Sequence, residues 1–189
     1  IRDRCTTIER INITIANRVV QKFIENMKIE AIADSVINIL NDKTSFDFIS
    51  NILVQIRKYK TEDIINTVSK KIDTSMPIDS IDRLIKFCLV NKKIIRVGTV
   101  LSIISTGLEN SDESDVINSI CNQLSEFGKE YFTQNKNELA AVIYKCFNKT
   151  GSEKVKTSLL RIVSELKIRR QFKLLLSEKE LTYYESNIK

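Results

Sequence analysis

The densest group of side chains able to bind anions lies near the C-terminus, in residues 167–173, which read KIRRQFK. If one helix carries this stretch, its four cations form neighbouring pairs, because residues three or four apart share a helix face. Clustered long cations bind carboxylates or phosphates, and they release condensed counterions when they contact a nucleic acid. An alternative reading is a solvated helix face whose cations favour a helix C-terminus. The candidate partner-binding residues are Arg161, Lys167, Arg169, Arg170 and Lys173.

Smaller basic clusters occur earlier in the chain, and most of them fall at predicted helix ends. In a stack of antiparallel helices, alternate helix ends lie at the same edge, so several clusters would merge into one stripe. The alternative is a set of independent cations that each favour a helix terminus. The clusters are Arg57-Lys58-Lys60, Lys70-Lys71 and Lys92-Lys93-Arg96.

Catalytic chemistry has little support in the sequence. The chain has no His to act as a general base at neutral pH, and its four Gly residues are isolated, so no glycine-rich phosphate loop is present. The acidic run at 109–115 lacks the spacing of a calcium-binding loop. We therefore expect a non-enzymatic protein, with no catalytic residue, no cofactor and no metal site.

The four cysteines, Cys5, Cys88, Cys121 and Cys146, form no CxxC pair. Most of them lie among apolar residues at helical spacing, which predicts buried free thiols in a reducing, intracellular compartment, cytoplasmic or nuclear. A second reading is a secreted, disulfide-bonded helical bundle. Residues 12–14 and 148–150 match the glycosylation acceptor pattern and keep that reading open.

Composition favours a globular all-α protein. Of the 189 residues 42% are hydrophobic and 29% are charged, whereas Gly and Pro number only 4 and 1, too few for the many turns of a β-sandwich. The net charge of +6 permits nucleic acid, acidic proteins or anionic lipid as partners. No apolar run reaches about 18 residues, so we expect no membrane insertion. The start at Ile1 suggests part of a longer protein.

Helix-start signals recur about every 17 residues through the first two thirds of the chain, a spacing typical of short helices stacked in pairs. Apolar residues follow each signal at intervals of three and four. We expect one domain over residues 1–189, with a hinge near 107–115. The predicted helices span about 7–27, 29–40, 45–59, 61–72, 77–90, 94–106, 115–127, 137–147, 152–166 and 178–188.

A segment of about 25 residues resembles a recurring helix of MIF4G domains, which are HEAT-like helical arrays of translation-initiation and mRNA-decay scaffolds. The residues that carry the resemblance are 160–166, which read LRIVSEL, followed by Ile168 and Phe172. The resemblance implies a crescent of paired antiparallel helices that binds proteins and sometimes RNA. It also implies that Arg161 and Glu165 connect neighbouring helices rather than contact a ligand.

We therefore expect an all-α fold of antiparallel helix pairs stacked as a HEAT- or MIF4G-like array of about nine or ten helices. The expected function is a protein–protein interaction scaffold within a larger protein, in RNA metabolism or translation. One alternative is an RNA- or DNA-binding module that uses the C-terminal basic stretch. Another is a compact helical bundle acting as a viral regulator or a cytokine-like ligand.

Overall fold

A computed structural model of the chain describes residues 18, 22, 26–41, 61–72, 76–111 and 113–188. The chain divides into two compact units, Ile1–Lys70 and Lys71–Lys189. The predicted helices at 7–27 and 45–59 lie largely or wholly outside the described residues. In the first unit, two helices each bury one apolar stripe: Ile32, Ala33 and Val36 of α2, and Ile64, Ile65 and Val68 of α4.

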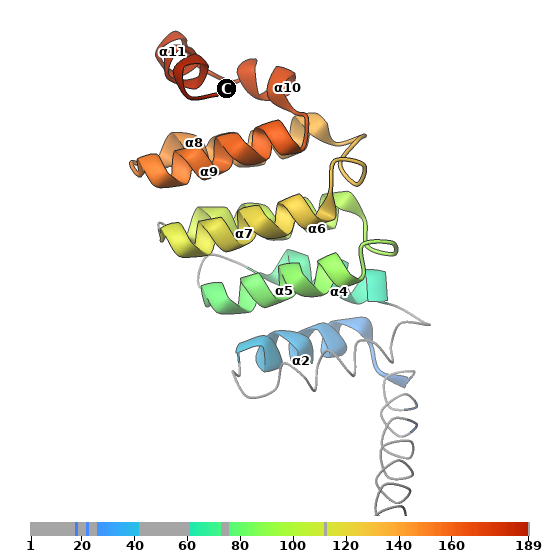
Figure 1. The fold of residues 1–189 in the computed structure, drawn as a ribbon. Helices are drawn as coiled ribbons and strands as arrows, with labels where there is room; N and C mark the ends of the chain where they lie inside the picture. The colour runs from blue at the N-terminus through green and yellow to red at the C-terminus, as the bar shows by residue number, and fades with distance from the viewer. Residues whose placement is uncertain are drawn as a thin grey trace, which may run out of the picture. The chain divides into compact units, whose positions relative to one another are not determined.

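Within the described ranges every regular element is a helix, which confirms the predicted all-α class. In the described part of the second unit, seven helices follow one another, joined by connections of three to eight residues. The helices are α2 (Ile29–Asn41), α4 (Thr61–Lys71), α5 (Ile78–Val90), α6 (Val97–Asn110), α7 (Ser114–Phe127), α8 (Lys136–Lys149), α9 (Glu153–Glu165), α10 (Arg169–Lys173) and α11 (Glu178–Asn187) (Figure 1).

Several helix boundaries follow from local capping chemistry that the sequence displays. The Ser152 hydroxyl accepts a hydrogen bond from the Val155 amide at the start of α9. Ser177 and Glu180 form the predicted capping box of α11. Gly128 ends α7 with a φ of +82°, a conformation that an L side chain rarely adopts. All three signals can be recognised in the sequence, because each depends on residues within one helical turn.

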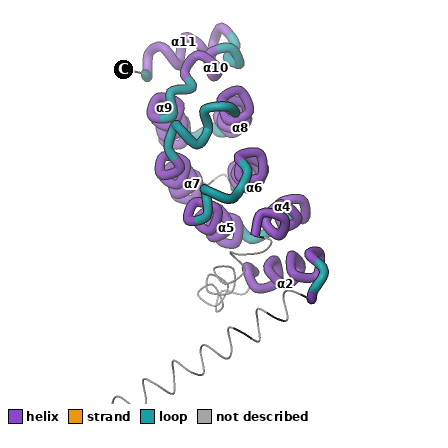
Figure 2. Tube along the Cα trace, turned by 90° about the vertical axis from the view of Figure 1, so that its right-hand side faces the viewer, coloured by secondary structure: helices purple, strands orange, loops and turns teal. Residues whose placement is uncertain are grey.

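The second unit is a two-layered stack of antiparallel helices. In one layer α7 packs between α5 and α9, and in the other α8 packs between α6 and α10 (Figure 2). Contacts of α6 with α5 and α7, and of α9 with α8 and α10, join the layers. Each helix of the second unit therefore contacts a helix two positions along the chain. This arrangement confirms the predicted array of stacked antiparallel helices.

Apolar stripes at helical spacing fill the space between the layers. Each of the longer helices contributes side chains that are completely or almost completely buried, so the stack has a continuous apolar interior. Those side chains include Ile81, Leu84, Ile85, Val100, Ile103, Ile104, Ile117, Ile120, Leu124, Leu139, Ile143, Val155, Leu159, Ile162 and Val163.

A polar contact also fixes α5 against α7. One carboxylate oxygen of Asp82 accepts hydrogen bonds from Ser119, at 2.8 Å, and from the Gln123 amide nitrogen, and the other oxygen lies 2.6 Å from the Lys86 ammonium group. Partial burial raises the pKa of Asp82, but the ion pair with Lys86 and the two α7 hydrogen bonds outweigh it, so the pKa lies below the usual value. The carboxylate therefore stays ionised at neutral pH and keeps this contact.

The predicted end of α6 was wrong. The sequence places Gly107 just after a helix over 94–106, whereas α6 runs from Val97 to Asn110 and contains it. Gly107 is buried, and a Cβ atom there would lie 3.0 Å from side-chain carbons of Ile81 and Ile120. Glycine is thus needed where α6 approaches α5 and α7 closely, and it does not terminate the helix.

The segment 107–115, predicted to be a hinge, lies inside the second unit. At the end of α6, the Glu109 carbonyl accepts a hydrogen bond from the Lys149 ammonium group of α8 at 2.8 Å. Lys145 of α8 lies 3.4 Å from the Glu109 carboxylate. The hinge stays a prediction.

Two glycines of α6 provide a matched pair that tests the close packing. Gly98→Ala should stabilise the protein by up to about 1 kcal/mol, because nothing lies within 4 Å of the new methyl group and Ala favours a helix. Gly107→Val should destabilise it by about 1–3 kcal/mol through overpacking. Urea denaturation measures both. Equal stability of the two variants would contradict the close approach at Gly107.

Candidate functional site

The C-terminal basic stretch is split by a turn, so its four cations do not all lie on one helix. α9 ends at Glu165, and Lys167 adopts a φ of +54° before α10 begins at Arg169. The Ile168 amide donates to the Val163 carbonyl at 3.1 Å, and the Lys167 amide donates to Ser164 at 3.2 Å. This is the Schellman pattern of a helix C-terminus.

The same pattern includes a buried apolar contact position, since Ile168 and Val163 are both fully buried. The residue in the left-handed position is normally Gly, and here it is Lys167. The sequence gives no sign of the turn, because neither Gly nor Pro stands at 165–169.

Arg161 connects α9 to α7. Its guanidinium group donates to the Asn122 side-chain oxygen at 2.8 Å and lies 3.7 Å from Glu165. Glu165 in turn accepts a hydrogen bond from Ser125 of α7 at 2.6 Å. The expectation that Arg161 and Glu165 connect neighbouring helices is therefore confirmed, and a partner-binding role for Arg161 stays a prediction.

Arg169 and Lys173 lie together at the border of α10 and α11. They line a hollow of about 280 Å³ with Tyr184, Glu185 and Ile188; we call it the C-terminal hollow. The Lys173 ammonium group lies 3.0 Å from the Glu185 carboxylate and 5.3 Å from the centroid of the Tyr184 ring. The Arg169 Nε atom donates to the Ser164 hydroxyl at 3.2 Å.

Tyr184 is the unusual member of the C-terminal hollow. Only 2% of its surface is exposed, yet its hydroxyl oxygen has no hydrogen-bond partner among the described residues. Burial raises the pKa of Tyr184, and the two nearby cations, Arg169 and Lys173, oppose that shift. The hydroxyl is therefore protonated at neutral pH and can donate a hydrogen bond to an anion that enters the hollow.

The remaining candidates lie elsewhere. Arg170 is exposed on α10. Lys167 lies in the turn after α9, where the neighbouring amino group of Lys129 lowers its pKa and repulsion from Lys136 adds to this shift. The structure thus brings Arg169 and Lys173 into one hollow but places Arg161 against α7 and Lys167 beside the α7–α8 connection.

Sequence reasoning missed three residues of these sites. Tyr184, Lys129 and Lys136 are not among the candidate residues that the sequence analysis names. A signal for the two lysines exists, because both lie in the connection between two predicted helices, at 128–136. That their side chains approach Lys167 depends on the stacking of α7 against α9, which is a contact between residues far apart in the sequence.

The described cysteines and acidic residues were the remaining candidates for a nucleophile or a metal site. Cys88, Cys121 and Cys146 are buried free thiols, and burial raises the pKa values of Cys88 and Cys121 to about 12. Across those same ranges, no group of three or more His, Cys, Asp or Glu residues could hold a metal ion. A search of the described helices for one long and apolar enough to cross a membrane finds none.

Comparison with known proteins gives no match: no family model, no curated protein and no solved structure is similar to this chain.

Replacement of Lys167 by Gly tests the strain in the turn after α9. Lys167→Gly should stabilise the protein by about 1 kcal/mol, because Gly adopts positive φ without the steric cost of a side chain. Lys167→Ala is the control, since it removes the charge but keeps a Cβ atom, and it should bring no comparable gain. Thermal denaturation at high salt measures both, and equal stabilities would contradict the strain.

The buried thiols should resist alkylation. In a Cys5→Ser variant, N-ethylmaleimide at pH 8 should label the native protein more than ~100-fold more slowly than the denatured protein, because the thiolate is the reactive form. Mass spectrometry should find three labels after denaturation in guanidinium. Rapid native labelling of Cys88 or Cys121 would contradict their burial.

Proposed function

We propose that this chain is a non-enzymatic scaffold, of HEAT or MIF4G style, that binds another protein within a larger assembly in RNA metabolism or translation. The observation that carries the proposal is the C-terminal hollow, where Arg169 and Lys173 flank the unpartnered hydroxyl of buried Tyr184. A carboxylate side chain of a partner in this hollow would add its negative charge beside both cations and could accept the proton of that hydroxyl.

Exposed leucines next to the C-terminal hollow support a protein partner. Leu174 and Leu175, which directly follow Lys173, are 80% and 37% exposed. Large apolar side chains beside a charged recess are typical of protein interfaces, in which a buried anchor is surrounded by polar contacts. An acidic and apolar segment of a partner fits this combination.

The alternative of nucleic-acid binding through the C-terminal stretch requires that its five cations share a surface. Their distribution over the α7–α9 contact, the loop after α9 and the C-terminal hollow favours a protein partner for this end of the chain. The alternative of a cytokine-like or viral helical bundle has a separate test, which is whether the cysteines are free thiols or disulfides.

A charge-reversal experiment tests the proposal. Affinity purification with an Arg169→Glu/Lys173→Glu variant should lose a specific protein that the unchanged chain retains, because the variant reverses both cations of the hollow. Leu174→Ser should weaken the same interaction by about tenfold, a typical effect of losing one apolar anchor.

Matched variants control for folding and for total charge. Lys154→Glu/Lys179→Glu changes the net charge equally at exposed positions away from the hollow, and Val90→Ser removes an apolar side chain that is 68% exposed elsewhere. Both controls should retain the partner. A partner set that is identical for all four variants would refute the proposal.

A further inference from the structure

The connections that follow α5, α7 and α9 lie at one edge of the second unit, which faces the viewer in Figure 2. We call residues 91–96, 128–136 and 166–168 the basic edge. The Tyr131 hydroxyl donates to the Ile95 carbonyl at 2.8 Å, which joins the first two segments. Lys92 donates to the carbonyls of Glu126 and Phe127 at 3.0 and 3.2 Å, at the end of α7.

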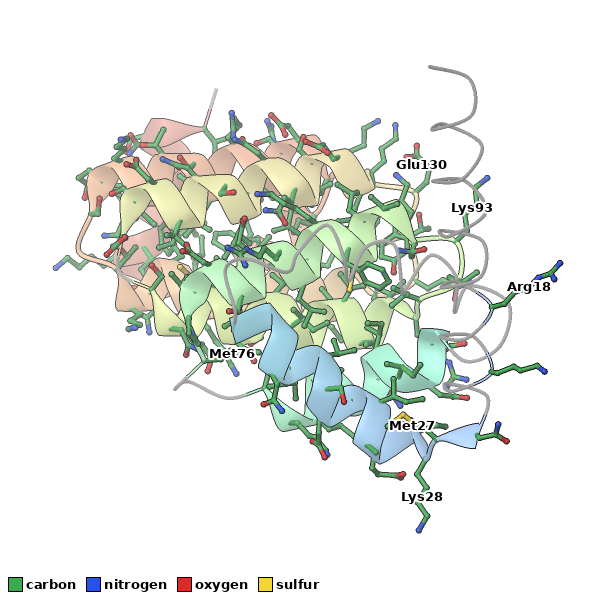
Figure 3. All side chains as sticks on the ribbon, turned by 90° about the horizontal axis from the view of Figure 1, so that it is seen from below. Arg18, Met27, Lys28, Met76, Lys93 and Glu130 are labelled. Carbon is green, nitrogen blue, oxygen red and sulfur yellow. The ribbon has the colours of Figure 1, made fainter. Side chains whose placement is uncertain are left out.

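The second and third segments follow α7 and α9, which pack against each other. In keeping with this packing, Lys129 and Lys136 lower the pKa of Lys167. Figure 3 shows Lys93 of the first segment and Glu130 of the second at the same end of the stacked helices. The three segments therefore form one continuous edge.

Charge is unequally distributed between the two edges. Along the basic edge, Glu130 is the one carboxylate, against six cations: Lys92, Lys93, Arg96, Lys129, Lys136 and Lys167. The connections at the opposite edge, 111–113, 150–152 and 174–177, contain two acidic residues and no cation, and the first turns of the helices that begin there add Asp115, Glu153, Glu178 and Glu180 beside Lys154 and Lys179. Asp79, Asp82 and Asp115 line a hollow where α5 and α7 begin, at that opposite edge.

The cations of the basic edge occupy positions that local helix energetics disfavour. Arg96 is the N-cap residue of α6, whose first turn has no acidic residue, and Lys136 is the first residue of α8, whose first turn also holds Glu138. A helix N-terminus favours negative charge, so these placements oppose the helix dipole. The helices that begin at the opposite edge follow the dipole, with acidic residues in the first turns of α5, α7, α9 and α11.

Lys167 departs from local preference in a second, independent way. It holds the left-handed position of the α9 C-terminus, where Gly is favoured, and its amino group lies against that of Lys129. A strained backbone and like-charge repulsion at one exposed residue indicate a role outside the stability of the monomer.

We infer that the basic edge binds the phosphate backbone of a nucleic-acid strand. Successive connections repeat at the spacing of packed helices, about 8–10 Å, so the cations form a line rather than a compact patch. A nucleic-acid backbone carries one anion at every nucleotide and matches such a line. Folded proteins seldom present an unbroken row of carboxylates of that length, so the line favours nucleic acid over an acidic protein.

Fluorescence anisotropy with a labelled 20-nucleotide single-stranded RNA tests the inference on the full chain. Binding should be measurable at about 50 mM salt, and its affinity should fall steeply as salt rises. The Lys93→Glu/Lys129→Glu/Lys167→Glu variant should bind at least ~10-fold more weakly, and the slope of log affinity against log salt should shrink by about 2. Lys92 stays unchanged in this variant because it contacts the α7 carbonyls.

The control is Lys28→Glu/Lys154→Glu/Lys179→Glu, which makes the same change in net charge at exposed positions outside the basic edge. It should leave the affinity within about twofold of the unchanged chain, because none of these lysines belongs to the three segments that would contact the strand. Three outcomes would overturn the inference: no RNA binding at about 50 mM salt, equal losses in both triple variants, or tighter binding of an acidic peptide of the same charge.

Lys167→Gly separates binding from folding. The inference predicts a variant that is more stable than the unchanged chain, yet binds RNA several-fold more weakly and with a reduced salt slope. Lys167→Arg restores the charge and should recover the affinity. If Lys167 has a structural role in the turn only, Lys167→Gly gains stability and its RNA affinity stays unchanged. That result would refute the assignment of Lys167 to phosphate binding.

Discussion

Each long helix of the second unit buries apolar side chains against the helix two positions away, and this constraint determines the rest of the unit. α7 illustrates it: Ile117, Ile120 and Leu124 are fully buried, and the helix packs between α5 and α9. Because neighbours within a layer are alternate helices, every second connection must lie at the same edge. The apolar spacing of the sequence thereby sets which charged connections meet.

Polar contacts between helices determine the orientation of the helices more than the stability of the stack. Asp82 bonds to Ser119 and Gln123, and Arg161 bonds to Asn122. Each of these contacts joins helices that already share a buried apolar face, and exposed pairs contribute little stability on their own. Their effect is to favour one rotation of a helix about its axis, which fixes the side chains that the edges present.

Local signals in the sequence predict the helices, and contacts between distant residues account for what the sequence does not predict. The capping box at Ser177 and the glycine at 128 follow from chemistry within four residues, so both were predictable. Gly107 reads as a helix stop, because its close approach to Ile81 and Ile120 appears only when three helices pack. Lys167 breaks the basic stretch without Gly or Pro, since the buried pair Ile168 and Val163 compensates for the strained backbone.

The two candidate surfaces differ in the feature that destabilises the folded chain when no ligand is bound. At the C-terminal hollow, the cost is one buried tyrosine hydroxyl without a hydrogen bond, which a single acidic group would remove. At the basic edge, the cost is spread over opposed helix dipoles, like-charge contacts and the turn at Lys167, and only an extended anion relieves all of them together. The two proposals therefore differ in the ligand that they require, a single acidic group for the first surface and an extended anion for the second.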